Sequence, residues 1–430
     1  MSKFVNQIAC FCLLLIGATA GYSNGISSDT SRAYAVPTLT RTPSGDVALS
    51  WTEKDNDGIV YFYWAKSGDQ GKTFGDKKLI YSAAGIGNSR LMRPKLLFRK
   101  DGSAVAVFAL RGPQSASSQA VAAQKPPQEP AHAGHDAHGA GHQAEAPKPA
   151  RSGGGRPSDL QIVYAVSADQ GNTWTQPTPV HADKTPNIVR GFFDATVLAN
   201  GEIAVAYLND IQGKAHQRDL RFVTSARGKF SDERILDPFV CDCCNISLLV
   251  DPAGALHLYY RENQDNIRDI AQMSSTDNGR TFSKPQILSK DNWQINGCPH
   301  SGPTSSAGGG SPLVAWFSGT QDSPGIRVVN EQGKRLFVLD DPTAKNAYLV
   351  PAQKSSVLLW EQSQSSESGM SSVIAFRNIN GAATPSTQFV KNAQNGTNAS
   401  GLVLDGQLVV AYEVRKPNNK NSIEWATVSL

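Results

Sequence analysis

Short stretches in which apolar and polar residues alternate run along nearly the whole chain. This period of two is typical of β-strands that bury one face against a core. Gly, Asp and Asn residues separate the stretches, and these residues favour tight turns. No long segment has the spacing of an amphipathic helix, so the pattern predicts an all-β protein.

One unit recurs along the chain: an apolar strand, a Gly/Asp/Asn turn, and a second strand ending in an aromatic. A third strand follows each copy, and a fourth usually does. We count seven copies: AVPTLTRTPSGDVALSW, MRPKLLFRKDGSAVAVF, FFDATVLANGEIAVAYL, NISLLVDPAGALHLYY, SGPTSSAGGGSPLVAWF, AYLVPAQKSSVLLWE and ASGLVLDGQLVVAYE. Four strands recurring about every fifty residues predict a β-propeller of four-stranded antiparallel blades, with seven repeats counted and six as the alternative.

The last repeat lacks a fourth strand, and residues before Val36 could supply it and close the ring. A closed ring removes the exposed sheet edges that would otherwise pair with other chains. The propeller is therefore expected to form a single domain over residues 21–430.

A sharper motif, S-x-D-x-G-x-T-[FW], occurs three times between a third and a fourth strand. The Asp side chain can accept hydrogen bonds from backbone amides of the turn, and Gly tolerates a positive φ. The motif therefore predicts a tight hairpin with a structural role. Its residues are Ser67, Asp69, Gly71, Thr73 and Phe74; Ser167, Asp169, Gly171, Thr173 and Trp174; and Ser275, Asp277, Gly279, Thr281 and Phe282.

These motifs are Asp boxes, and with the repeats they make the chain resemble the sialidase-like Asp-box (BNR-repeat) propellers. In sialidases three arginines bind the substrate carboxylate, and a Tyr activated by a Glu attacks the sugar. The resemblance places the first arginine in Ala35-Val36-Pro37, where there is none. It places the Glu at Asp194, and it finds neither the next arginine in YLND nor the Tyr in NGTNASGLVL. The resemblance thus predicts the fold and disfavours sialidase activity.

Residues 1–20 have the pattern of a secretory signal peptide, with Lys3 before a short apolar run and small residues before Gly21. That run is too short to span a membrane. We expect an exported protein, periplasmic or secreted. The net charge of +4, without a basic block, gives no indication of nucleic-acid binding.

Residues 113–157 form an insertion in the second repeat that almost lacks bulky apolar residues, so we expect it to be disordered. Four of the chain's eight histidines lie in it: His132, His135, His138 and His142. A flexible histidine-rich segment can act as an auxiliary metal collector, although it can also be only a linker.

The remaining cysteines fall in two segments. CDCCN contains Cys241, Cys243 and Cys244 and precedes the fourth repeat, and GCPHS contains Cys298 and His300 and precedes the fifth. Successive blades of a propeller begin on the same face, so both segments are expected at one rim, close to each other. The insertion is expected to emerge on that face too.

Three interpretations of this cluster stay open. An exported protein with an even number of cysteines favours disulfides, for example between Cys243 or Cys244 and Cys298. Thiolates with an imidazole also suit a Cu(I) or Zn(II) ion, and soft ligands favour copper. The third interpretation is a catalytic thiol with His300 as its base.

The most consistent function is binding of a small ligand or metal ion through this cluster, without catalysis. The alternative, from another class, is an exo-acting carbohydrate-active enzyme such as a glycosidase acting on a different sugar. Its weak catalytic candidates are Asp194, Glu262 and Asp265. Candidates for binding an anionic ligand are Arg93, Arg190 and Arg261.

Overall fold

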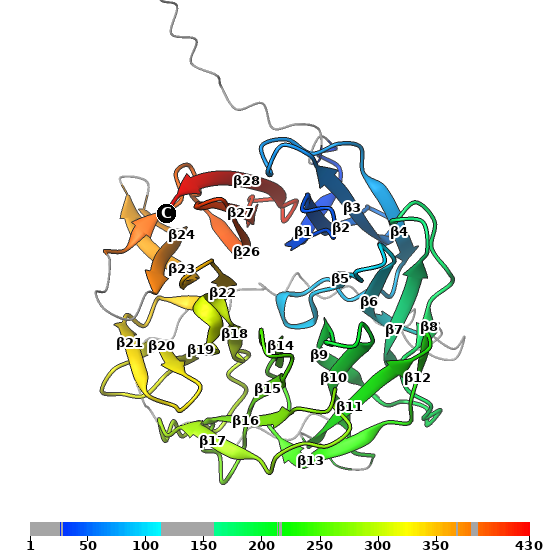
Figure 1. The fold of residues 1–430 in the computed structure, drawn as a ribbon. Helices are drawn as coiled ribbons and strands as arrows, with labels where there is room; N and C mark the ends of the chain where they lie inside the picture. The colour runs from blue at the N-terminus through cyan, green and yellow to red at the C-terminus, as the bar shows by residue number, and fades with distance from the viewer. Residues whose placement is uncertain are drawn as a thin grey trace, which may run out of the picture.

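In the computed structural model the chain forms a ring of seven antiparallel β-sheets arranged about a common centre (Figure 1). The structure describes residues 26, 29–112, 159–212, 214, 217–366, 369–379 and 386–430. The expected signal peptide, the insertion at 113–157 and its four histidines fall outside these residues. The prediction of an all-β propeller with seven repeats is confirmed.

Each sheet is one blade, and its first strand is the innermost. Blade 1 contains β1 (Ala33–Arg41), β2 (Val47–Lys54), β3 (Val60–Ser67) and β4 (Lys78–Ala83); blade 2 contains β5 (Lys95–Phe98), β6 (Ala104–Arg111), β7 (Leu160–Ser167) and β8 (Thr178–Pro179). Blade 3 contains β9 (Arg190–Val197), β10 (Ile203–Asp210), β11 (Arg218–Ala226), β12 (Lys229–Phe230) and β13 (Arg234–Val240). Both β12 and β13 pair with β11.

The other blades follow in chain order. Blade 4 contains β14 (Ser247–Val250), β15 (Leu256–Arg261), β16 (Ile270–Ser275) and β17 (Gln286–Ser289); blade 5 contains β18 (Thr304–Ser306), β19 (Leu313–Ser318), β20 (Gly325–Asn330) and β21 (Arg335–Asp340). Blade 6 contains β22 (Lys345–Pro351), β23 (Ser356–Ser366), β24 (Gly369–Ile379) and β25 (Gln388–Phe389), and blade 7 contains β26 (Gly396–Leu404), β27 (Gln407–Val414) and β28 (Ser422–Ser429). The two short 3-10 helices are η1 (Arg90–Met92) and η2 (Gly308–Gly310). No helix among the described residues has the length and apolar character needed to cross a bilayer.

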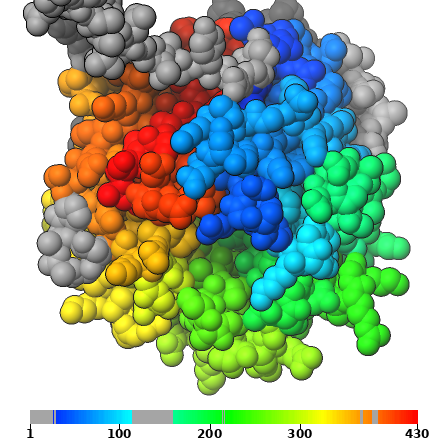
Figure 2. Space-filling model, turned by 45° about the horizontal axis from the view of Figure 1, so that its top comes forward, coloured from blue at the N-terminus to red at the C-terminus, as the bar shows by residue number. Residues whose placement is uncertain are grey.

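The ring closes where blade 7 packs against blade 1, as the adjacent blue and red segments of Figure 2 show. The Val36 amide donates a hydrogen bond to Glu413 Oε1 at 2.7 Å across this junction. The Tyr34 amide donates to the Asn421 carbonyl at 2.9 Å. Among the described residues blade 7 has three strands, and residues 29–36 contribute these junction contacts; the rest of the segment expected to supply a fourth strand lies almost entirely outside the described residues.

The Asp boxes form the hairpins that the motif predicts. In the first box the Thr73 amide and hydroxyl donate to Asp69 at 2.9 and 2.6 Å, and the other two boxes repeat this arrangement. The box glycine also touches the preceding blade, because a Cβ on Gly171 would lie 2.5 Å from Trp64 Cζ2. The boxes therefore set the spacing between neighbouring blades as well as building turns.

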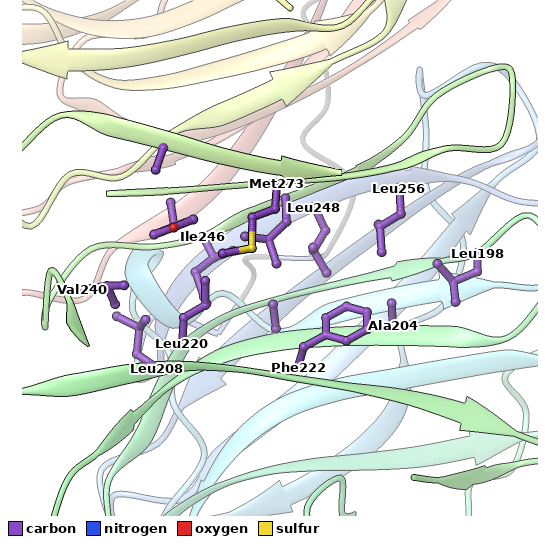
Figure 3. Packing of buried hydrophobic residues seen from close by; sticks show 14 residues of the cluster. Leu198, Ala204, Leu208, Leu220, Phe222, Val240, Ile246, Leu248, Leu256 and Met273 are labelled. Carbon is purple, nitrogen blue, oxygen red and sulfur yellow. The ribbon is translucent and has the colours of Figure 1, made fainter. Parts of the chain in front are cut away.

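Hydrophobic layers fill the space between blades. Between blades 3 and 4, side chains of β10 and β11 meet those of β15 and β16 (Figure 3). Phe222 and Met273 belong to this layer, and so do Val240 and Ile246, which lie just before and after the segment with three cysteines. The segment is thus anchored in the core at both ends.

Candidate metal centre

Two connections carry the sulfur-bearing residues. The fourth lead-in (residues 241–246) joins β13 of blade 3 to β14 of blade 4, and the fifth lead-in (residues 290–303) joins β17 of blade 4 to β18 of blade 5. Each therefore reaches the start of the innermost strand of its blade. As expected from the propeller topology, the two lie side by side.

Direct hydrogen bonds join the lead-ins. Asn245 Oδ1 accepts a hydrogen bond from the Gly302 amide at 2.9 Å, and its Nδ2 donates to the Pro303 carbonyl at 3.2 Å. Two residues further along each segment, the hydroxyls of Ser247 and Ser305 are 2.7 Å apart. Sequence reasoning missed these residues, and the only available signal was that Asn245 directly follows the cysteines.

Three thiols gather in the fourth lead-in. Cys241 Sγ lies 3.2 Å from Cys244 Sγ and 3.9 Å from Cys243 Sγ. All three side chains are buried, with exposed fractions of 1% for Cys241, 4% for Cys243 and 2% for Cys244, and Phe192 packs against them. These distances exceed the S–S bond length of about 2.05 Å, and all four described cysteines are free thiols.

The fifth lead-in completes a second group. The ligand atoms of Cys243, Cys298 and His300 lie within 4.8 Å of one another, as do those of Cys241, Cys243 and Cys244. Cys298 and His300 are exposed. The structure therefore brings together all five expected metal-binding residues, and Cys243 belongs to both groups.

Arg261 occupies the buried wall of this cluster. Its Nε donates to the Ser301 carbonyl at 2.8 Å and its Nη2 to the Phe317 carbonyl at 2.9 Å, while Nη1 donates to the Arg268 carbonyl. Its own carbonyl accepts a hydrogen bond from the Cys241 amide at 3.1 Å. We expected Arg261 to bind a ligand; in the structure its guanidinium bonds the fifth lead-in at Ser301, and its backbone carbonyl bonds the fourth lead-in at Cys241.

The thiols shift one another's proton affinities. Burial alone would raise the pKa of Cys244, but hydrogen bonds with Cys241 and Cys243 and the positive charge of Arg261 lower this pKa well below its usual value. Hydrogen bonds with Cys241 and with Cys244 raise the pKa of Cys243, and burial adds to that shift. The cluster thus favours a thiolate at Cys244 with neighbouring thiols as donors, and thiolates are the form that binds metals.

The other expected site residues lie outside the cysteine cluster, although Asp194 lines a pocket beside it. Arg190 is buried and pairs with Asp183, with Nη2 2.7 Å from Oδ2. Asp194 accepts hydrogen bonds from the Ala195 and Leu248 amides and forms an ion pair with Lys95 at 2.6 Å. Both side chains already have strong partners within the scaffold.

The two remaining acidic candidates differ in environment. Burial raises the pKa of Glu262 to about 7, and Asp237 and Cys241 add to the shift. Asp265 is exposed on the turn between β15 and β16. No hydrogen bond or ion pair joins these two acids or links either of them to Asp194 in the described structure.

A pocket opens where the innermost strands begin, beside the metal centre. Asn245 and Ser301 from the two lead-ins and Ser247 at the start of β14 line it, together with Arg90 and Arg93, which lie just before β5 of blade 2. Arg93 donates to the carbonyls of Pro37 and Asn398, at 2.8 and 3.0 Å, and lies over the Tyr348 ring. Of the three arginines expected to bind ligand, Arg93 alone lines this pocket.

Several innermost strands have a bulge near this pocket. Asn346 and Asn398 line the pocket with φ values of 55° and 52°, at register shifts in β22 and β26. Phe192 at the cysteine cluster has φ 52° and lies in a similar shift in β9. Bulges redirect side chains and often occur next to functional sites, and the alternating pattern of the sequence does not reveal them.

Comparisons with known proteins agree on the fold. Residues 150–302 match a family model described as a BNR repeat-like domain. A protein of unknown function from Dyadobacter fermentans DSM 18053 is 14% identical with a TM-score of 0.52, and the match covers 94% of this chain and 96% of that one. An ulvan lyase, a polysaccharide lyase solved bound to -[GlcA(1-4)Rha3S]-, is also 14% identical with a TM-score of 0.54, covering 93% and 94%.

A Hadza microbial sialidase is 15% identical with a TM-score of 0.48, and the match covers 93% of this chain and 66% of that one. A search of curated proteins found no match. The Dyadobacter protein and the ulvan lyase, with TM-scores above 0.5, share the architecture of this chain, and at 14% identity they show the fold alone. Residues 150–302 match the repeat model, and the three Asp boxes and the ring of seven sheets agree with the BNR-repeat β-propeller fold that the sequence resembles.

Proposed function

We propose that this propeller binds a soft metal ion, Cu(I) in preference to Zn(II), through Cys241, Cys243, Cys244, Cys298 and His300. The observation that carries the proposal is the meeting of four thiols and an imidazole from two neighbouring blades. Buried free thiols without a disulfide partner are otherwise inert, whereas thiolates in mutual contact bind soft ions tightly.

The geometry supports copper over zinc. Structural zinc takes four ligands in a tetrahedron, whereas Cu(I) accepts soft thiolate ligands. Each of the two ligand groups contains three residues, and in the described residues no fourth ligand atom lies within 4.8 Å of all three. The N-terminal sequence predicts export to an oxidising compartment, where free thiols are prone to oxidation. A bound ion would also protect these thiols against it.

Metal analysis of protein purified from the periplasm tests the proposal. We expect bound copper in the wild type and less of it in the double variant Cys298→Ala/His300→Ala, with an unchanged urea unfolding midpoint. His257→Ala is the matched control, because its Nε2 bonds Asp251 and it belongs to neither ligand group. Wild-type protein that contains no metal and whose four thiols are all oxidised would instead support the disulfide interpretation.

A second proposal is that the neighbouring pocket binds an acidic carbohydrate, with or without turnover. Arg90 and Arg93 support it, because both line the pocket and no carboxylate pairs with them in the described structure. Guanidinium groups recognise carboxylates and sulfates well. Binding of acidic oligosaccharides that Arg93→Met abolishes would support this proposal, and turnover of fluorogenic glycosides that Asp194→Asn abolishes would show an enzyme.

A further inference from the structure

Cys243 occupies a special position in the cluster. Its sulfur lies within 4.8 Å of the ligand atoms of two different pairs, Cys241 with Cys244 on the buried side and Cys298 with His300 on the exposed side. The five ligand atoms do not form one group in which every atom lies within 4.8 Å of every other. They form two groups of three that share only Cys243. A single ion therefore cannot contact all five ligand atoms without rearrangement of a lead-in.

We propose that the centre holds two Cu(I) ions and that the Cys243 thiolate bridges them. The inference rests on the proposed metal-binding function and specifies its nuclearity. Thiolate sulfur has several lone pairs and can bind two soft ions at once, whereas an imidazole nitrogen binds only one. Each thiol that binds copper releases its proton to solvent, and no electron transfer is involved.

The inner ion has three thiolate ligands: Cys241, Cys243 and Cys244. These side chains are almost fully buried, and Phe192 covers them. A trigonal set of thiolates in a dry environment suits Cu(I), which has no need of a water ligand. The inner site is therefore expected to release its ion slowly.

The outer ion has Cys243, Cys298 and His300 as ligands. Cys298 and His300 face solvent, and His300 has a φ of 50°, an unusual conformation for a residue other than glycine. Such strained backbone persists where surrounding structure maintains it, and it often marks a functional position. The outer site is therefore the entry point through which copper reaches the inner one.

Arg261 offers positive charge that offsets part of the negative charge of the thiolates, whereas Arg218 nearby is itself paired with Asp210 at 2.6 Å. Arg261 lies beside Cys244, and Arg218 donates from Nη1 to the Asp242 carbonyl at 2.7 Å. Arg268 is buried next to the Gly297 carbonyl, and two of its nitrogens, Nε and Nη1, have no hydrogen-bond partner in the described structure. A buried cation that lacks partners is costly unless a negative centre lies nearby.

Stoichiometry tests this inference directly. Reduced metal-free protein is titrated anaerobically with Cu(I) against a chromogenic Cu(I) chelator, and bound copper per chain is measured. We expect two ions in the wild type, one in Cys298→Ala/His300→Ala, and one in Cys241→Ala/Cys244→Ala. Cys243→Ser should lose the bridge and with it the tight binding of both ions. His257→Ala should keep two.

X-ray absorption of the loaded wild type should show a Cu–Cu scattering contribution that Cys298→Ala/His300→Ala lacks. One ion per wild-type chain, or a fall to zero in either double variant, would overturn the two-ion centre and leave metal binding itself intact. If folded, reduced wild-type protein binds no copper, both the metal-binding proposal and the two-ion centre are wrong. Far-UV circular dichroism and urea unfolding of each variant show whether a loss reflects misfolding.

Discussion

Asn245 and Gly302 are in direct contact across two blades: Asn245 Oδ1 accepts the Gly302 amide at 2.9 Å, and the Asn245 backbone carbonyl lies against the Gly302 Cα. A Cβ added to Gly302 would lie 1.9 Å from that carbonyl oxygen. The proximity of Cys243 to Cys298 and His300 depends on this contact, because it holds the two lead-ins together.

Gly302→Ala should therefore separate the lead-ins. Overpacking of this kind costs roughly 1–3 kcal/mol in free energy of unfolding, and the misplaced fifth lead-in should weaken copper binding as well. Urea unfolding of the metal-free protein and Cu(I) titration measure the two effects. Gly297→Ala is the control in the same lead-in, because its Cβ would meet nothing within 4 Å; equal effects of both changes would argue against the contact.

Arg261→Met should affect stability and metal affinity together. The change leaves the carbonyls of Ser301 and Phe317 without their charged donor, so we expect a loss of about 2–4 kcal/mol in free energy of unfolding. Residues that orient metal ligands typically contribute about 10–100-fold to affinity, and a similar loss is expected for Cu(I). Arg41→Met, at the exposed end of β1, is the control. Unchanged affinity in the variant would show that Arg261 does not position the lead-ins.

The Asp boxes should make the fold sensitive to acid. Partial burial raises the pKa of Asp69, but hydrogen bonds from Thr73 and Ser67 outweigh it and lower the pKa to about 2; the same bonds from Thr173 and Ser167 lower the pKa of Asp169 to about 2. An unfolded Asp titrates near about 3.9, so these carboxylates stabilise the fold fully above that pH.

Their contribution is lost as the pH falls from about 4 towards about 2. Urea midpoints measured from about pH 5 to about pH 2 should decrease over this window, and Asp69→Asn should reduce the slope. Asp76→Asn, at an exposed position just after the first box, should leave the slope unchanged. A slope that Asp69→Asn does not alter would mean that other carboxylates dominate acid unfolding.

The box glycines should have two separable roles. Gly171 and Gly201 have φ values of 81° and 82°, so replacement by Ala strains the backbone equally, by roughly 1–2 kcal/mol. Only at Gly171 would the new Cβ also collide with Trp64, whereas nothing lies within 4 Å at Gly201. Gly171→Ala should thus lose about 1–3 kcal/mol more than Gly201→Ala, and equal losses would exclude a role in spacing the blades.

The propeller was readable from the chain because its information is local. Each blade repeats alternating strands and turn residues, and an Asp box such as Ser67–Phe74 forms its hydrogen bonds within a few neighbouring residues. The meeting of the two cysteine-bearing segments was predictable as well, since consecutive blades must begin on the same face. The closing of blade 7 was not, because it depends on side chains such as Glu413 that contact Val36 across the whole length of the chain.

The sequence alone thus predicts the number of repeats, the strand pattern of each blade and the rim on which the sulfurs lie. Short-range hydrogen bonds and the alternation of apolar and polar residues govern these features. The division of the five ligand residues into a buried and an exposed group around Cys243, and the use of Arg261 as a support, come from three-dimensional packing. Burial and donor geometry at each sulfur arise from residues distant in the chain, so no local pattern of the sequence encodes them.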